Sequence, residues 1–218
     1  MNRIGLLGGT FDPVHNGHLQ LSQVVLDSVG LERILFIPAA HPPHKDEFQV
    51  SDSCHRLAML RLALADRDAL AISDIEMGRR GMSYTIDTLE ELERAGLPLT
   101  HCHFIIGSDA IAEIETWYRW QKLLISINFI VAVRPGFSVK EIKQLLGRKG
   151  FRQQRYDAHD RWTHQQGRNE IIFLADEMAD ISSTDIRSRI SGGRTWQHLV
   201  PGAVADYIKA KRLYISTK

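Results

Sequence analysis

Residues 8–18 read GGTFDPVHNGH and directly follow the apolar run Arg3–Leu7. This order predicts a buried strand that enters a tight turn at its paired glycines. Glycines at such a turn let the backbone approach a ligand closely and point N–H groups at phosphate oxygens. The apolar spacing of residues 17–29 predicts a helix closed by Gly30, whose positive dipole end would face the same ligand.

The alternation of apolar runs and amphipathic segments continues along the chain. It predicts strands at residues 33–37, 70–75, 102–106, 128–133 and 170–174, and helices at 51–65, 85–95, 117–125, 139–146, 184–190 and 201–211. Strands that alternate with helices imply an α/β fold with a doubly wound, mostly parallel sheet flanked by helices. Residues 152–169, rich in Gln, Arg, His and Asp, are expected to form a surface excursion without chemistry.

Ligands of such sheets bind at the carboxyl ends of the strands, near the point where the strand order reverses. Three polar turns are predicted at that edge, at residues 8–10, 107–109 and 134–136. The prediction is therefore a ligand site built from the first, fourth and fifth strands.

Composition excludes several classes of protein. The chain has 218 residues, of which 44% are hydrophobic, so it can bury a core and is not disordered. Its formal net charge of +1 is low for a protein that binds duplex nucleic acid. Cys54 and Cys102 form no CxxC pair, which favours two reduced thiols. Because no apolar stretch reaches ~20 residues, we expect no membrane span and a cytoplasmic location.

His15 and His18 stand one helical turn apart at the start of the first predicted helix, so their rings can lie side by side. Two imidazoles there suit oxygens on which negative charge develops. A pair with this spacing is also compatible with half of a metal site or with a plain surface. The segment matches neither the GxxxxGK[ST] phosphate loop nor the GxGxxG dinucleotide motif.

Four later segments add candidate phosphate and ring contacts. Residues 181–187, ISSTDIR, place hydroxyls and an arginine at a helix start, which makes a phosphate-binding corner or an ordinary cap. Lys45 in PPHK is a point charge suited to phosphate, although loop lysines are usually only solvated. In residues 80–89, RGMSYTIDTL, Ser83 or Thr85 could simply cap a helix, and Trp117 could simply be core.

Taken together, these motifs resemble a known superfamily. GGTFDPVHNGH resembles the GxFDxxHxGH signature of nucleotidyltransferases related to class I aminoacyl-tRNA synthetases, and ISSTDIR is similar to their ISSTxIR signature. PPHK, RGMSYTIDTL and the Trp117 region narrow the resemblance to the bacterial nicotinate-mononucleotide adenylyltransferases. The likeness runs from residue 4 to about residue 214 and is weakest over 152–169. Gly107-Ser108-Asp109 stands where that family commonly shows GAD.

The resemblance implies a Rossmann-like fold and one nucleotidyltransferase domain, residues 1–218, whose helices at about 181–214 complete the ATP site. It implies catalytic roles for His15, His18, Lys45 and Arg187. It implies ATP contacts from Gly8, Gly9, Thr10, Phe11, His15, His18, Gly107, Asp109, Ile181, Ser183, Thr184 and Arg187. It implies mononucleotide contacts from Lys45, Tyr84, Thr85, Trp117 and Arg134. No metal site of the protein's own is expected, because Mg²⁺ would arrive with ATP.

The implied reaction joins nicotinate mononucleotide to the AMP part of ATP and gives deamido-NAD and pyrophosphate. Nicotinamide mononucleotide and phosphopantetheine stay open as acceptors, although pantetheine-phosphate adenylyltransferases are shorter and lack the SYTxDTL and Trp117 features. A tRNA-binding or aminoacylating fragment is disfavoured by the near-zero net charge and the absence of a KMSKS-like run. A nucleotide sensor without activity is a further alternative. No nucleic-acid or membrane partner is expected, and the chain would be a monomer or a homodimer.

Overall fold

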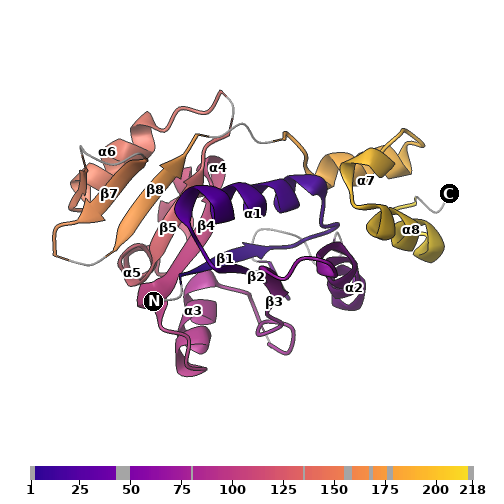
Figure 1. Ribbon diagram of the computed structural model, residues 1–218, viewed down its shortest axis with the longest axis horizontal. Coiled ribbons are helices and arrows are strands. Elements are labelled where there is room, and N and C mark those ends of the chain that lie inside the picture. The colour runs from indigo at the N-terminus through magenta and orange to yellow at the C-terminus, as the bar shows by residue number, and fades with distance from the viewer. Residues whose placement is uncertain are drawn as a thin grey trace.

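The computed structural model describes residues 3–42, 50–79, 81–134, 136–154, 159–166, 169–175 and 179–215. Within them, eight strands form one sheet in the order β3-β2-β1-β4-β5-β8-β7-β6 (Figure 1). The strands are β1 Ile4–Gly9, β2 Arg33–Pro38, β3 Leu70–Ile72, β4 Cys102–Gly107, β5 Asn128–Ala132, β6 Phe151–Gln153, β7 Asp160–His164 and β8 Glu170–Leu174. The helices are α1 Asn16–Val29, α2 Ser53–Leu64, α3 Thr85–Arg94, α4 Ser108–Ala112, α5 Trp120–Ser126, α6 Lys140–Arg148, α7 Ser183–Ser191 and α8 Gly202–Lys211.

The strand order reverses between β1 and β4. The chain runs from β1 outward through β2 to β3, then returns to place β4 on the other side of β1. All strand pairs from β3 to β8 along the sheet are parallel, whereas β7 runs antiparallel to both of its neighbours, β8 and β6. The predicted doubly wound, mostly parallel, Rossmann-like architecture is therefore confirmed, and its switch point lies at the ends of β1 and β4.

Each face of the sheet carries its own core. Leu6 and Leu7, neighbours in β1, point to opposite faces and belong to different apolar clusters. Helices α1, α2, α7 and α8 cover the face of Leu7, whereas α3, α4, α5 and α6 cover the face of Leu6. Figure 1 shows α7 and α8 beside α2 at one end of the molecule, with β7 and α6 at the other. In the described ranges no helix combines the length and apolarity that a membrane crossing requires.

The expectation for residues 152–169 was wrong in part. Instead of a surface excursion, this region supplies the end of β6 and all of β7, which extend the sheet beyond β8. The two strands lie at the edge of the sheet, so most of their side chains are only half-buried and their polar composition hides them from a hydrophobicity pattern. Trp162 packs on the apolar cluster beneath and anchors the addition.

Two element bounds also differ from the sequence prediction. The helix expected at 117–125 is preceded by a 3-10 turn, Ile114–Thr116, and α5 begins only at Trp120. Arg119 adopts the left-handed conformation, with φ 51°, and this bend separates Trp117 from the helix. The third strand ends at Ile72 rather than residue 75, because the chain turns toward Glu76.

A charged network closes the sheet at the amino ends of β1, β4 and β8. The Glu170 carboxylate lies 3.1 Å from Arg3 Nη2 and 3.0 Å from His103 Nε2, and it also pairs with Arg161. The His103 hydrogen bond, and then Arg161, hold the Glu170 pKa down at about 2. Because the network lies opposite the switch point, we assign it to stability.

This network predicts acid sensitivity. The Glu170 pKa is depressed in the folded state. The ionised carboxylate therefore stabilises the fold fully at pH values above its unfolded pKa of ~4.3, and this contribution is lost as the pH falls toward 2. Glu170→Gln should therefore lower the free energy of unfolding at pH 7 by about 1–3 kcal/mol. Urea unfolding from pH 7 to pH 3 should show the deficit shrinking, with the exposed Glu32→Gln variant as control. A deficit that is constant with pH would contradict the assignment.

Candidate active site

The loop after β1 is shaped by the side chain of Phe11. Phe11 is buried and has a left-handed backbone, with φ 51°, and its ring turns back over Gly9. A Cβ added at Gly9 would lie 2.9 Å from the Phe11 ring, so only glycine fits there. The same ring meets the His18 ring edge-on at 5.0 Å. The Phe11 ring therefore packs against both Gly9 and His18 and holds them in position.

His15 and His18 form a stacked pair, as their spacing predicts. Their ring centroids are 3.7 Å apart with an interplanar angle of 26°. The His15 backbone N–H donates to His18 Nδ1 at 3.3 Å. A neutral His18 ring with Nδ1 as acceptor carries its proton on Nε2, so Nε2 is the nitrogen that can donate.

Burial and the charge of Arg134 lower the pKa of His15 to about 4. His15 is therefore neutral at pH 7 and acts as a neutral imidazole in the ligand-free protein. Permanent positive charge in this region comes from the arginines rather than from His15.

One cavity, of about 300 Å³, opens beside the histidines at the carboxyl ends of β4 and β5. Arg134 lies on its wall, where its backbone N–H donates to Ser108 Oγ at 3.1 Å. The Arg134 side chain pairs with Asp109 at 3.4 Å, with both side chains about half exposed. The full lining is His15, Gly17, His18, Leu21, Gly107, Ala132, Val133, Arg134, Ala179, Asp180, Ile181, Ser182, Ser183 and Thr184. We name it the histidine cavity.

The start of α7 closes the histidine cavity from the C-terminal side. Ser182 caps α7 by accepting from the Asp185 N–H at 3.1 Å, and Ser183 Oγ donates to the Pro13 carbonyl at 2.9 Å. Arg187 donates from Nη1 to the Asp12 carbonyl at 2.7 Å. The predicted phosphate-binding arginine thus holds the β1–α1 loop in this structure and is not among the residues that line the cavity.

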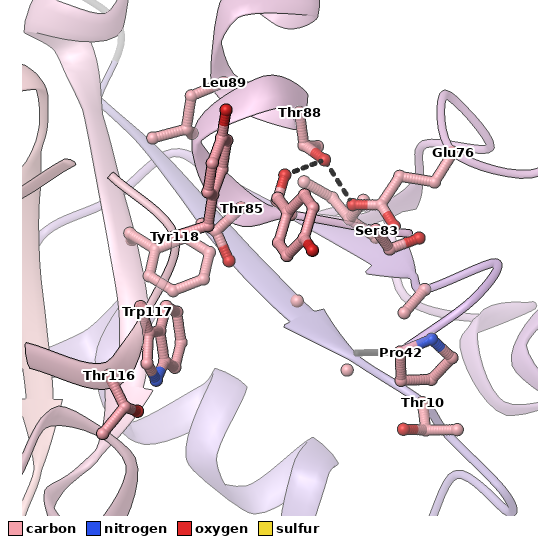
Figure 2. A pocket seen from close by; sticks show the side chains of 16 residues that line it. Thr10, Pro42, Glu76, Ser83, Thr85, Thr88, Leu89, Thr116, Trp117 and Tyr118 are labelled. Carbon is pink, nitrogen blue, oxygen red and sulfur yellow. Dashed lines mark hydrogen bonds between the residues drawn. The ribbon is translucent and has the colours of Figure 1, made fainter. Parts of the chain in front are cut away.

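A second cavity, of about 240 Å³, lies on the other side of the loop (Figure 2). Aromatic residues form one wall: Tyr84 packs on Tyr118 at 4.6 Å, and Trp117 meets Phe104 edge-on at 6.5 Å. The lining is Gly8, Gly9, Thr10, Ile37, Ala39, Pro42, Glu76, Ser83, Tyr84, Thr85, Thr88, Leu89, Phe104, Thr116, Trp117 and Tyr118. We name it the aromatic cavity.

The two cavities divide the predicted site residues. Tyr84, Thr85 and Trp117 line the aromatic cavity as one group, and Gly107, Ile181, Ser183 and Thr184 line the histidine cavity with His15 and His18. The structure also places Gly8, Gly9 and Thr10, expected at ATP, on the aromatic cavity, and Arg134, expected at the mononucleotide, on the histidine cavity. Lys45 lies outside the described residues.

Sequence reasoning missed Arg56, which is bonded to two residues of the aromatic cavity, Thr10 and Ala39. This buried side chain donates to the carbonyls of Thr10 at 2.9 Å, Ala39 at 2.7 Å and Ser51 at 3.0 Å. It therefore ties the β1 loop to the segment after β2 and to the start of α2. A signal was available, since an arginine on the apolar face of the predicted 51–65 helix needs buried partners.

Sequence reasoning treated Ser83 only as a possible helix cap and missed its hydrogen bonds to the chain that leaves β2. Its hydroxyl accepts from the backbone N–H groups of Ala40 at 3.1 Å and His41 at 3.2 Å. These bonds fix the SYT segment against the chain that leaves β2, and so set the width of the aromatic cavity. Nothing in the local sequence shows this partner, because the contact spans more than forty residues.

Comparison with known proteins identifies the family of this chain. The profile of the cytidylyltransferase-like family matches residues 6–189, and the chain belongs to that family. A protein from Geobacter sp. strain M21 is 40% identical over 217 residues, covering 99% of this chain and all of the relative. A protein from Geobacter sulfurreducens is 42% identical over 213 residues, covering 97% and 98%. Both are named "Probable nicotinate-nucleotide adenylyltransferase", so within the family the chain is a member of the nicotinate-nucleotide adenylyltransferases.

A solved structure shares the fold. The Plasmodium falciparum nicotinic acid mononucleotide adenylyltransferase complexed with NaAD aligns with a TM-score of 0.75 at 19% identity. The alignment covers 98% of each chain. The sheet and helices described above thus share the fold of that protein, although the sequences have diverged widely.

The neutral state of His15 is testable by histidine NMR titration. The His15 midpoint should lie near pH 4, because burial disfavours the charged ring and Arg134 opposes it further. Arg134→Gln should raise that midpoint but keep it below the ordinary value of ~6.5, since burial is the larger cause. His15→Gln assigns the resonance. A His15 midpoint near 6.5 in the native protein would refute this account of its charge.

Proposed function

We propose that this protein transfers the AMP part of ATP to nicotinate mononucleotide, giving deamido-NAD and pyrophosphate. The observation that carries the proposal is that one loop, residues 8–18, lines two cavities of different chemistry. Its first residues line an aromatic cavity, and its last residues line a cavity with histidine, hydroxyl and arginine groups. The names of the full-length relatives support the same acceptor.

ATP is assigned to the histidine cavity. His15, His18, Ser183 and Thr184 would offer donors for the phosphates, and Asp109, in the first turn of α4 and paired with the cavity residue Arg134, would accept from the ribose. Arg134 and Arg187 supply the positive charge, and Lys45 stays a prediction for the same role. The C-terminal helices beyond residue 181 would complete this site within a single domain.

The mononucleotide is assigned to the aromatic cavity. The flat face of Trp117 suits an electron-poor pyridine ring by stacking. The carboxylate of the acceptor would meet the start of α3 at Tyr84 and Thr85, where no side chain caps the helix and the helix dipole favours an anion. Gly8, Gly9 and Thr10 then lie toward the phosphate end.

The chemistry requires positioning rather than a base. The attacking oxygen belongs to a phosphate monoester whose second pKa is ~6, so it is already mostly ionised at neutral pH. The protein must hold two polyanions in line and stabilise the charge on the transferred phosphate. Neutral His15 and the Nε2 proton of His18 can donate hydrogen bonds to that phosphate.

Magnesium is proposed to enter with ATP. In the ranges the structure describes, no group of three or more His, Cys, Asp and Glu side chains is placed to hold a metal ion. The half-exposed Asp109 and the cavity-lining Asp180 are the carboxylates available near the phosphates. A cation held mostly by phosphate oxygens and water fits this donor set and would offset phosphate charge.

The proposal is tested by pyrophosphate release from ATP. Nicotinate mononucleotide should support turnover well above the background without an acceptor, and nicotinamide mononucleotide and phosphopantetheine are assayed beside it. Product analysis should show deamido-NAD. Faster turnover with either alternative acceptor would overturn the acceptor assignment, and no release with any acceptor would overturn the enzymatic one.

His18→Ala should abolish most activity while the fold persists. Losing one donor to the developing charge costs about 2.7–4 kcal/mol, a reduction of roughly 100- to 1,000-fold in kcat. His101→Ala is the matched control, because His101 lies before β4, away from both cavities, and this variant should keep wild-type turnover. A folded His18→Ala protein with near wild-type kcat would exclude His18 from catalysis.

A further inference from the structure

Glu76 is a buried carboxylate in the wall of the aromatic cavity. Only 6% of the residue is exposed. Its Oε1 accepts from the Thr88 hydroxyl at 2.5 Å, whereas its Oε2 is buried with no hydrogen-bond partner among the described residues. A buried acceptor without a partner is costly, which points to a bound donor as its complement.

Neighbouring side chains hold this carboxylate in one orientation. Arg79 donates to Thr88 Oγ1 at 2.9 Å, and Thr88 in turn donates to Glu76. Arg79 is itself anchored on Glu91 at 2.6 Å. Of the two acceptors near the Thr88 hydroxyl, Glu76 Oε1 at 2.5 Å is closer than the Tyr84 carbonyl at 3.3 Å, so the hydroxyl proton goes to Glu76. Oε2 is left without a partner among the described residues.

The position of Glu76 in the aromatic cavity indicates which part of a bound mononucleotide it would contact. Figure 2 shows Trp117 and Thr116 at one end of the cavity and Glu76 and Pro42 at the opposite end. A ring stacked on Trp117 therefore places the next unit of the molecule, the sugar, toward Glu76. Thr10 lies at the same end as Pro42, where the phosphate of such a ligand would follow its sugar.

We propose that Glu76 accepts a hydrogen bond from a ribose hydroxyl of the mononucleotide and so selects ribonucleotide acceptors. The assignment rests on the proposed function. A nicotinate mononucleotide has an anionic phosphate, an anionic carboxylate and a ring nitrogen without a proton. The ribose hydroxyls are thus the only donors it can present to a carboxylate, and the two anions would be repelled.

The inference is tested with nicotinate mononucleotide and its 2′-deoxy and 3′-deoxy analogues as acceptors. The wild-type protein should use one of the analogues with kcat/KM about 10- to 100-fold below that of the ribonucleotide, as expected for a hydrogen bond to a charged group. Glu76→Ala should lose a similar factor on the ribonucleotide and should no longer distinguish it from that analogue. Glu76→Gln, whose amide oxygen can still accept, should keep part of the discrimination.

Glu93→Gln is the matched control, because Glu93 is an exposed acid on α3, the helix that carries Thr88, and lies outside the cavity. It should keep the wild-type ratio of ribonucleotide to deoxy analogue. Circular dichroism checks each fold, and if Glu76→Ala does not fold, the ratio is read from Glu76→Gln. An unchanged ratio in the folded Glu76 variants, or no discrimination by the wild type, overturns the inference. Failure of wild-type turnover with the ribonucleotide would instead overturn the proposed function.

Discussion

The buried carboxylate of Asp12 binds three distant parts of the chain to one loop. Its oxygens accept from the Ser51 N–H at 3.1 Å and the Tyr214 hydroxyl at 2.6 Å, and its backbone carbonyl accepts from Arg187. The loop between β1 and α1 has left the sheet, so its polar groups must find partners elsewhere. The partners come from the start of α2, from α7 and from the end of the chain. Burial first, and Asp12 second, raise the Tyr214 pKa, so Tyr214 stays a proton donor.

This anchoring explains how charge is distributed around the loop. Arg56 donates a hydrogen bond to the Thr10 carbonyl, and Arg187 donates one to the Asp12 carbonyl. These bonds hold the backbone of the loop in place. Arg134 is held only by a half-exposed pair with Asp109, so it is the arginine most easily recruited by an incoming phosphate. His15, kept neutral by burial and by Arg134, contributes a hydrogen bond and no charge. The site therefore places permanent cations, the arginines, beside a neutral His15 imidazole.

The parts of the fold that could be predicted from the sequence are those set by contacts between residues near in the chain. Apolar runs ending in glycine, as at Leu7 and Gly8, mark buried parallel strands, and ligand turns follow at their carboxyl ends. Local pattern failed where long-range contacts decide. The polar edge strands β6 and β7 exist because they pair with β8, and Trp117 leaves its predicted helix because Arg119 bends the chain. The partition of the site between two cavities could not be read from the motif, since it depends on which side of the loop each neighbour packs.

The same partition gives the loop its mechanical importance. Thr10 lines the aromatic cavity and His15 lines the histidine cavity, so the backbone between them links the two proposed substrate sites covalently. That backbone is immobilised at Phe11, whose ring fills the space over Gly9, and at Asp12 and Pro13, which are bonded to Tyr214, Arg187 and Ser183. In-line attack tolerates little displacement of one substrate relative to the other. Arg187 and Tyr214, from the C-terminal part of the chain, therefore help to fix the distance between the two cavities, although neither residue lines the aromatic one.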